Sequence, residues 1–418
     1  MPEAVAVIGA GFAGLKCAGT LAQAGHDVTV FEASDGVGGR ARTDEIDGFR
    51  LDRGFQVLLR AYPEAQRTFD YEALELGDFE PGALIRLNGD FAPLVDPIKR
   101  PGRIFAAVGS PVIGLADKLR IARMRQDLVS HSPAEILARP DITALESLRQ
   151  RGFSPLAIER FFKPFFGGVF IDPDLSTSSR LLEIFFRCFT KGPASLPAGG
   201  IGRLAESMTA NVGEDRIRLE TPVREVRPDG VRLDDGEWVD ASAVVVATDE
   251  KSAAGLADLP EPADGRVTTC VYYDAPEADI RARTLYLSPD DSGPINELAV
   301  PSAVGEGYAP PGRSLVSVSA VGDEALSGDL EPRMRRQLSD WFGTEVVAGW
   351  NHLATRTVTD ALPDFGPGRF KVGGLSPELD SGLFICGDYR ESPSIQGALA
   401  SGRKAAEAVS ERLRSPSP

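Results

Sequence analysis

Blocks of apolar and polar residues near the start of the chain predict a strand, a helix and a second strand. Residues 4–8 (AVAVI) form a continuous apolar run, which is typical of a strand buried on both faces of a parallel sheet. Apolar residues within 15–22 then recur at helical spacing, and Gly25 follows as the residue that ends the helix. Residues 27–31 (DVTVF) predict the second strand, which leads directly into the acid Glu32.

The turn between the first strand and the helix reads GAGFAG, a GxGxxG motif. Gly9 allows the tight turn, Gly11 lets a pyrophosphate approach the backbone, and Gly14 lets the helix pack closely on the strand. The helix N-terminus attracts phosphate, and an acid 18 residues after the motif is placed to hydrogen-bond a ribose hydroxyl. This context predicts a dinucleotide site rather than a glycine turn without a ligand. The expected contacts are Gly9, Gly11, Phe12, Ala13, Gly14, Glu32 and Ala33.

A glycine-rich segment, residues 35–43 (DGVGGRART), follows this acid, where a simple NAD-binding domain would continue into a crossover helix. Gly38 and Gly39 indicate a loop tight enough to wrap a second phosphate or the edge of a flavin. Arg40 and Arg42 offer cations to a pyrophosphate. The alternative is a solvated turn that carries two surface arginines.

Together these motifs resemble those of the superfamily of FAD-dependent amine oxidases, phytoene desaturases and protoporphyrinogen oxidases. The resemblance extends over nearly the whole chain. Its further motifs are Asp52-Arg53-Gly54, residues 165–173 (FFGGVFIDP), residues 197–200 (PAGG) and residues 384–388 (FICGD) with Gly397-Ala398. The resemblance implies FAD as the cofactor. We expect it to be held non-covalently, because no Cys or His is placed for a covalent flavin link.

The C-terminal motif also has a physical interpretation of its own. Residues 383–386 predict a buried strand, and residues 395–413 predict a helix capped by Ser394 or Ser392. The positive end of that helix would stabilise an anionic reduced flavin, and the resemblance implies that Asp388 accepts hydrogen bonds from the ribityl chain. The expected contacts are Gly387, Asp388, Gln396 and Ala398. The alternative is an ordinary C-terminal helix docked on its domain.

A strand–hairpin–strand block occupies residues 223–247, and the resemblance implies that Val223 or Val226 presents backbone groups to adenine. We expect an α/β fold in which a Rossmann-like, doubly wound FAD-binding domain of the glutathione-reductase type is interleaved with a mixed α+β substrate-binding domain. The expected FAD-binding pieces are 1–80, 191–255 and 356–418, and the expected substrate-binding pieces are 81–190 and 256–355. No second GxGxxG stands between a strand and a helix, so we expect oxygen or a quinone as the electron acceptor and no dedicated NAD(P)H domain.

Composition excludes several classes of function. The 418 residues carry a net charge of −16, from 61 acidic and 45 basic residues, which argues against nucleic acid as a partner. The four cysteines form no CxxC pair, so we expect neither a metal site nor a disulfide framework. No apolar run is long enough to span a membrane and no signal peptide is recognisable, which favours a cytoplasmic location. The sequence does not indicate an oligomeric state.

The segment 99–125 departs from the acidic average, with seven basic residues and one acid. Apolar residues interleave with these charges. Because related desaturases and protoporphyrinogen oxidases dock on membranes near a substrate entrance, the segment predicts a peripheral membrane contact. The alternative is a solvated helical face packed on its own domain.

Eight of the 21 phenylalanines fall within residues 161–189. We expect most of them to fill a core and one or two to face the flavin, which suits an isoprenoid, polyene or aromatic substrate. Amine oxidases usually place an aromatic ring at the position of Ser394 and a flavin-facing lysine on a substrate-domain strand, but residues 296–320 contain no lysine. The favoured function is hydride transfer from a small hydrophobic substrate to flavin N5, as in a desaturase or dehydrogenase. The alternatives are a flavin amine oxidase, a redox-neutral isomerase and a non-catalytic flavoprotein.

Few side chains are candidates for acid–base chemistry. Gln56 and Arg53 follow the glycine-rich loop and would reach the flavin face, and His352 is the best candidate base among the three histidines. Flavin desaturation depends more on positioning the substrate and excluding water than on a protein base. The lack of a strong candidate base is therefore compatible with an enzyme.

Overall fold

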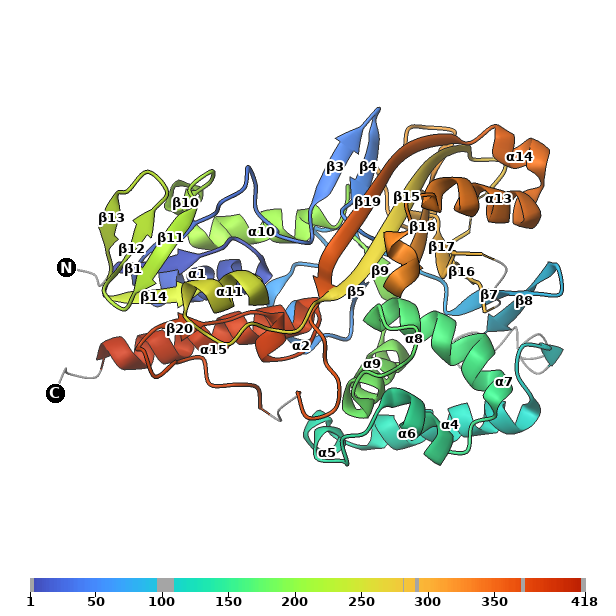
Figure 1. Ribbon diagram of the computed structural model, residues 1–418, viewed down its shortest axis with the longest axis horizontal. Coiled ribbons are helices and arrows are strands. Elements are labelled where there is room, and N and C mark those ends of the chain that lie inside the picture. The colour runs from blue at the N-terminus through green and yellow to red at the C-terminus, as the bar shows by residue number, and fades with distance from the viewer. Residues whose placement is uncertain (1–3, 96–108, 281, 290–292, 370–372, 415–418) are drawn as a thin grey trace.

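The computed structural model describes residues 4–95, 109–280, 282–289, 293–369 and 373–414. Two groups of elements lie side by side along the long axis of the molecule (Figure 1). A parallel sheet with its covering helices forms one group, which contains both the first and the last described elements. A seven-stranded sheet and a set of helices form the other group.

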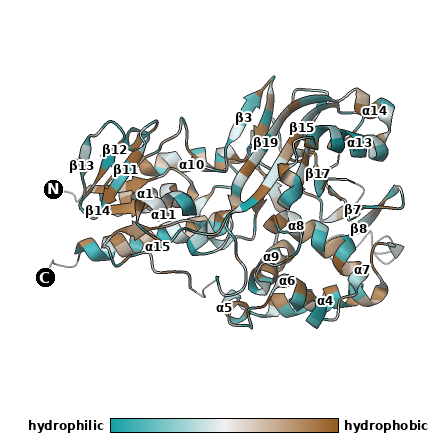
Figure 2. Cartoon of the chain, viewed as in Figure 1, coloured by the Kyte–Doolittle hydropathy of each residue, from teal (hydrophilic) through white to brown (hydrophobic). Residues whose placement is uncertain are grey.

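A five-stranded parallel sheet forms the centre of the first group, as the sequence predicts. Its strands, in spatial order, are β10 (Ile217–Arg218), β2 (Asp27–Phe31), β1 (Ala4–Ile8), β14 (Ala243–Val246) and β20 (Phe384–Ile385). The central strands β1 and β14 are apolar throughout because both faces of the sheet are covered. Figure 2 shows the hydrophobic colour concentrated on β14, whereas α9 (Ser179–Lys191), in the other group, carries both hydrophobic and hydrophilic residues.

Three helices pack on one face of this sheet and a small antiparallel sheet packs on the other. The helices are α1 (Phe12–Gln23), α10 (Gly202–Val212) and α15 (Ile395–Arg414). The opposite face carries β11 (Val223–Arg227), β12 (Gly230–Leu233), β13 (Trp238–Asp240) and α11 (Glu250–Leu256). Gly14 permits the close packing of α1, because a Cβ there would overlap the carbonyl of Gly9 and lie 3.2 Å from the Ala247 Cβ.

The seven-stranded sheet has a hydrophobic core on one face, and its other face carries a second hydrophobic cluster and borders a large cavity. Its strands, in spatial order, are β19 (Asn351–Leu362), β15 (Arg266–Pro276), β18 (Arg313–Val321), β17 (Glu297–Ala299), β16 (Leu285–Leu287), β7 (Gly82–Leu87) and β8 (Asp90–Val95). Side chains alternate between the two faces. Leu298 and Val318 join the core under α13 (Leu330–Phe342) and α14 (Thr344–Ala348), whereas their neighbours Glu297 and Ser319 border a large cavity on the opposite side.

A group of helices completes the second half of the molecule (Figure 1). These are α4 (Leu115–Ser130), α5 (Pro133–Leu137), α6 (Ala144–Gln150), α7 (Pro155–Ala157), α8 (Lys163–Phe170) and α9, with a π-helical turn at Ile158–Phe162 between α7 and α8. An ion-pair network fastens them: the buried Glu183 accepts from Arg139 at 2.7 Å and from Arg151, and both arginines also pair with Asp127. The network therefore joins α4, α6 and α9.

Shorter elements lie within the two groups and between them. They are β3 (Thr43–Ile46), β4 (Phe49–Asp52), β5 (Leu58–Leu59), β6 (Gly77–Asp78), β9 (Ala194–Leu196), α2 (Pro63–Thr68), α12 (Pro301–Val304) and the 3-10 turns Glu214–Arg216, Gly322–Leu326 and Asp388–Arg390. Strands β3 and β4 form a hairpin, and β5, β9 and β6 form a three-stranded sheet.

The structure also bears on an expected piece boundary and on the basic segment. The expected piece boundary between residues 355 and 356 falls inside β19, which pairs with β15 from Asn351 to Leu362 in the seven-stranded sheet. The basic segment 99–125 is described only from residue 109 onward. In the described part of the chain, no helix combines the length and the apolar character needed to cross a bilayer.

Candidate active site

A cavity of about 1370 Å³ lies between the two groups of elements and is lined by residues from both. Pockets that hold a single drug-sized ligand measure roughly 300–1,000 Å³. The cavity is therefore large enough for a cofactor together with a substrate. Its walls can be followed from the GxGxxG turn to the helices α8 and α9.

The first wall is the turn from β1 into α1. Gly9 has φ +104°, and a Cβ there would lie 2.8 Å from the carbonyl oxygen of Ala247, so only glycine fits. A Cβ on Gly11 would meet no atom within 4 Å, which leaves the backbone open to the cavity. Gly11 is the N-cap of α1 and offers no side chain to the first turn, where Phe12 and Ala13 also border the cavity. This open, uncapped helix start is the cradle that a pyrophosphate requires.

Glu32 is held firmly at the end of β2. Its Oε2 accepts from the Ala10 N–H at 2.7 Å, and its Oε1 accepts from the N–H and the hydroxyl of Ser34 at 2.9 and 2.7 Å. Each carboxylate oxygen retains further acceptor capacity. Glu32 and Ala33 both line the cavity, as a ribose-binding position requires.

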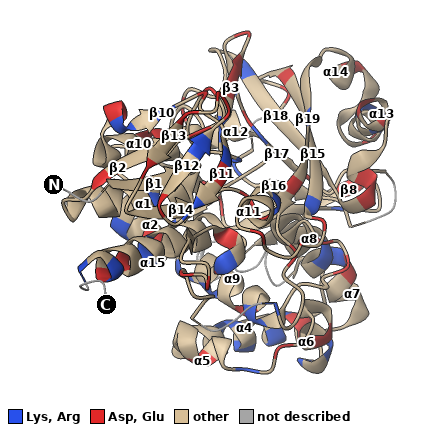
Figure 3. Cartoon of the chain, turned by 60° about the vertical axis from the view of Figure 1, so that its left-hand side comes forward, with Lys and Arg blue, Asp and Glu red and all other residues tan. Residues whose placement is uncertain are grey.

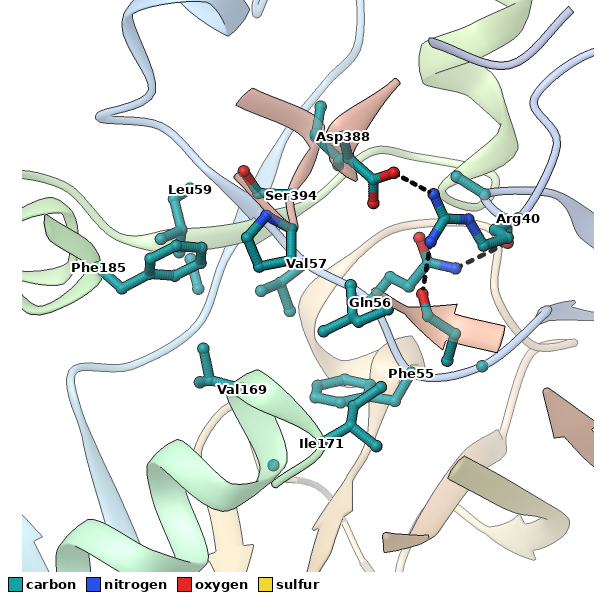
Figure 4. Close-up of a pocket in the computed structure, with 18 of the residues that line it drawn as sticks. Arg40, Phe55, Gln56, Val57, Leu59, Val169, Ile171, Phe185, Asp388 and Ser394 are labelled. Atoms are coloured by element: carbon teal, nitrogen blue, oxygen red, sulfur yellow. Dashed lines mark hydrogen bonds and ion pairs between the residues drawn. The ribbon is translucent and has the colours of Figure 1, made fainter. Parts of the chain in front are cut away.

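The glycine-rich loop meets the C-terminal motif across the cavity. Gly38, Gly39 and Arg40 line it, and Arg40 donates to Asp388 Oδ1 at 2.7 Å and to the Ala361 carbonyl at 2.9 Å (Figure 4). The sequence assigned Arg40 to the pyrophosphate and Asp388 to the ribityl chain separately. Both side chains line the cavity, and they also form an ion pair with each other.

The start of α15 faces the cavity, and Ser394 caps it by accepting from the Gly397 N–H at 3.1 Å. Gly387, Asp388 and Ala398 line the cavity, as expected. Gln396 is not among the lining residues, because its Oε1 accepts from the Glu64 N–H at 2.8 Å on the α2 side.

At the far end of the dinucleotide region, Val223 lines the cavity and Val226 does not. Val226 is buried in the core between the parallel sheet and β11–β13. The sequence did not point to Thr248 and Asp249, which border the cavity just after β14. Their position at the carboxyl end of a parallel strand is the signal that would have identified them.

The candidate catalytic residues lie in three different settings. Gln56 lines the cavity and its Nε2 donates to the carbonyls of Arg40 and Arg53 at 2.9 and 3.3 Å, so it braces the loop (Figure 4). Arg53 also lines the cavity, but its guanidinium forms an ion pair with Asp44 at 2.8 Å. His352 lies outside the cavity, on an exposed part of β19, with its Nε2 2.9 Å from the Thr355 hydroxyl.

Asp52 anchors the loop that precedes Arg53. Its side chain is buried and accepts from the Thr43 hydroxyl at 2.7 Å, the Ile201 N–H at 2.9 Å and the Tyr308 hydroxyl at 2.8 Å. Burial raises the pKa of Asp52 to about 6, although these three donors oppose the rise. Asp52 thus ties the glycine-rich loop to residues from both halves of the molecule.

An aromatic wall closes the substrate end of the cavity. It consists of Phe161, Phe165, Phe166, Phe185, Phe186 and Phe189. Phe161, Phe165, Phe166, Phe186 and Phe189 pack on one another at centroid distances from 5.0 to 6.3 Å. The Phe185 ring packs on Phe170 at 5.3 Å. The sequence predicted that one or two of the eight phenylalanines face the flavin, and six of the eight border the cavity as a whole. Phe162 and Phe170 are buried away from it.

A polar strip crosses the opposite wall, on the cavity face of the seven-stranded sheet. It consists of Thr268 on β15, Ser319 on β18 and Glu297 on β17. Burial raises the pKa of Glu297 to about 7, with Asn296 and Ser319 as the opposing hydrogen-bond partners. Sequence reasoning missed Glu297, because its direction depends on the pairing of β17 with β18.

Comparisons with known proteins agree with this geometry. A sequence model of the family described as flavin containing amine oxidoreductase matches residues 12–410. Putrescine oxidase from Kocuria rosea is 29% identical over 264 residues, which cover 59% of this chain and 53% of that protein. Coproporphyrinogen III oxidase from Propionibacterium freudenreichii is 26% identical over 405 residues, covering 78% of this chain and 76% of that protein. The 4,4'-diaponeurosporene oxygenase of Staphylococcus aureus is 24% identical over 283 residues, covering 59% and 55%.

The fold is shared with solved structures. A putrescine oxidase variant from a redesign of cofactor binding superposes with a TM-score of 0.73 at 18% identity, over 99% of this chain and all of that chain. The matches to the curated putrescine oxidase and diaponeurosporene oxygenase span about half the length of those proteins. The family match covers most of the chain, and the cradle at Gly11, Glu32 and the α15 N-terminus fits FAD. The chain therefore belongs to the flavin-containing amine oxidoreductase family and is an FAD-dependent oxidoreductase.

Proposed function

We propose that this enzyme removes a hydride from a C–H bond of a hydrophobic substrate of the isoprenoid or polyene kind, as a desaturase or dehydrogenase does. The electrons then pass to oxygen or a quinone. The observation that carries this proposal is the aromatic wall, with six phenylalanines from the α7–α9 region bordering one cavity. Each methylene that a substrate buries against such a wall contributes about 0.8 kcal/mol to binding.

Two features of the site argue against an amine as substrate. Ser394 stands where amine oxidases usually carry an aromatic ring over the flavin, and here its hydroxyl caps α15. The cavity face of the seven-stranded sheet carries Thr268, Ser319 and Glu297 rather than a lysine. Among the described residues, the cavity-lining lysines, Lys118 and Lys191, come from the helices α4 and α9.

The residues of the chain position the substrate and exclude water from the site. When bound, FAD supplies the hydride acceptor. Gln56 fixes the loop beside the cavity, and the Arg40–Asp388 ion pair joins this loop to the C-terminal motif. The capped N-terminus of α15 places partial positive charge at the cavity, which stabilises negative charge that develops there. The phenylalanines exclude water from the reacting carbon.

The second candidate function is amine oxidation. The observation that favours it is the similarity to putrescine oxidase, at 29% identity over 264 residues. It requires a cationic or free amine to be held within a largely apolar chamber. Reduction of the bound flavin by a primary amine but not by a polyene would select this function over the desaturase.

Replacing wall phenylalanines tests whether the cavity binds the substrate chain. Phe165→Ala and Phe189→Ala should each raise KM for a polyene substrate several-fold while flavin content is kept, because each removes ring contacts that line the cavity. Phe162→Ala is the matched control, since Phe162 is fully buried outside the cavity and its loss should lower stability without changing KM. Equal effects of all three variants on KM would contradict the proposal.

We also propose that α4 contacts a membrane surface at the mouth of the cavity. Leu115 and Leu119 are 63% and 56% exposed, and both line the cavity. Figure 3 shows Lys and Arg residues on the same helix. Arg120 pairs with Asp117 at 3.0 Å, and residues 99–108 lie outside the described part of the chain. An apolar stripe flanked by cations suits an anionic lipid surface.

Vesicle co-sedimentation tests this contact. The wild-type protein should sediment with vesicles that contain phosphatidylglycerol and less with pure phosphatidylcholine. Leu115→Ser combined with Leu119→Ser should abolish the sedimentation, as should charge reversal at Arg120 and Arg123. Leu326→Ser is the matched control, because Leu326 is 61% exposed but does not line the cavity. Sedimentation that is unchanged in the double variant would contradict the proposal.

A further inference from the structure

Glu297 is a buried carboxyl group that the proposed hydride transfer does not use. Its side chain is 93% buried, since its relative exposure is 7%, and it lines the cavity from β17. Gly168 on α8 makes room for it, because a Cβ on Gly168 would lie 2.8 Å from Glu297 Oε2. The carboxyl group therefore lies between the sheet and the helix that carries the aromatic wall.

The partners of Glu297 are neutral. Asn296 Nδ2 donates to Glu297 Oε2 and also to the Pro164 carbonyl at 3.1 Å. Ser319 lies opposite Glu297 in the strand register and shares a hydrogen bond with it. Among the described residues, no Lys, Arg or His forms an ion pair with Glu297. A carboxylate in such a place lacks a compensating cation, so the protonated form is favoured.

The surrounding elements present little other charge to Glu297. On α8, Lys163 pairs with Glu159 at 3.0 Å. On β18, Arg313 forms an ion pair with Asp274 at the end of the strand. On β15, the Cys270 thiol lies 3.3 Å from the Ser319 hydroxyl, and burial raises its pKa above the ordinary value, so it stays neutral below pH 9. Glu297 is thus the group on this wall that changes charge near neutral pH, since its pKa is about 7.

The polar strip interrupts a chamber that is otherwise apolar. Thr268, Ser319 and Glu297 are each less than a tenth exposed, and all three border the cavity. Thr268 donates to the Ala320 carbonyl at 2.9 Å, and Ser319 hydrogen-bonds with Glu297. Because Asn296 is a donor to Glu297, the proton of a neutral Glu297 carboxyl group is the one that this strip can offer to the cavity. We propose that Glu297, in its protonated form, donates a hydrogen bond to an alcohol or carbonyl oxygen at one end of an otherwise hydrophobic substrate. The inference rests on the proposed function and names its substrate class.

Calorimetric titration of the FAD-loaded enzyme with matched ten-carbon isoprenoids tests this inference. The probes are geraniol, geranial and geranylamine, which share one hydrocarbon chain and differ in the head group. At pH 6 the wild type should bind geraniol and geranial more tightly than geranylamine. The Kd for geranial should rise as the pH passes about 7, since the donor proton of Glu297 is lost.

Two substitutions separate the donor from the charge. Glu297→Gln retains an N–H donor, so it should keep the Kd for geranial within about threefold and abolish its pH dependence. Glu297→Leu has no donor and should weaken geranial roughly tenfold, the worth of one hydrogen bond. Equal losses in both variants, or a wild-type Kd for geranial that does not change between pH 6 and pH 8, would overturn the inference.

A third variant distinguishes failure of this inference from failure of the proposed function. Phe165→Ala removes part of the wall that would hold the hydrocarbon chain, so it should weaken all three probes alike. If it does so while Glu297→Leu changes nothing, the role of Glu297 alone is refuted. If no probe binds, or if Phe165→Ala affects none of them, the hydrophobic-substrate proposal fails and this inference fails with it.

Discussion

Replacing Asp52 by asparagine should stabilise the protein at neutral pH. Two donors, the Thr43 hydroxyl and the Ile201 N–H, share Asp52 Oδ1, while the Tyr308 hydroxyl donates to Oδ2. An asparagine can place its carbonyl oxygen at the Oδ1 position and its amide at the Oδ2 position. The Tyr308 hydroxyl can then rotate to accept. The substitution keeps the hydrogen bonds and removes a buried negative charge.

The magnitude follows from the pKa of Asp52. Burial raises it from 3.8 to about 6, so the folded protein holds a proton that the unfolded chain has already lost between these values. The free energy of unfolding therefore falls as pH rises through this window, by roughly 3 kcal/mol in total. Between pH 5 and pH 7.5 the wild type should lose about 1.4 kcal/mol of this, and the Asp52→Asn variant should lose none of it.

Urea unfolding of the FAD-loaded protein, followed by tryptophan fluorescence at pH 5, 6 and 7.5, measures this effect. Glu297 titrates in the same range in both proteins, so its contribution cancels in the difference between them. Asp52→Leu is the control. It leaves three hydrogen-bond donors without an acceptor and should destabilise the protein at every pH, by roughly 1–3 kcal/mol for each donor. A stability difference between wild type and Asp52→Asn that does not change with pH would refute the reasoning.

The remaining predictions concern the cofactor cradle and the helices. Glu32→Ala should lower the flavin retained per protein after gel filtration, and unchanged retention would count against the ribose assignment. Gly11→Ala should fold with near wild-type stability and lose flavin, because its Cβ meets no protein atom, whereas Gly14→Ala should lower the melting temperature itself. Glu183→Ala removes the buried partner of Arg139 and Arg151, which both keep Asp127, and should lower the unfolding free energy by about 1–3 kcal/mol, measured by urea denaturation.

The N-terminal dinucleotide unit could be predicted from sequence because its signals are local. Residues 4–8 and 27–31 are strands with the predicted bounds, and the helix between them ends just before Gly25. The apolar runs, the glycine spacing and the helical periodicity all lie within 30 residues of one another. The same holds for α15 and its cap at Ser394, where the predicted and observed elements agree to within a residue.

The features of the site that the sequence could not show depend on contacts between distant segments. Arg40 and Asp388 are 348 positions apart in the sequence, so their ion pair forms only when these distant segments come together in the fold. Glu297 faces the cavity because β17 pairs with β18 in one register, and a shift by one residue would turn it away. His352 is exposed because β19 is the edge strand of its sheet. Composition and spacing contain none of this information.

Anaerobic titration of the FAD-loaded enzyme with a panel of isoprenoid polyenes and primary amines tests the central claim most directly. The visible absorbance of the bound flavin reports its reduction in the absence of oxygen. Hydride transfer from a hydrophobic substrate predicts that a polyene bleaches this absorbance and that the amines leave it unchanged. Bleaching by a primary amine, with none by any polyene, would contradict the account and make the enzyme an amine oxidase.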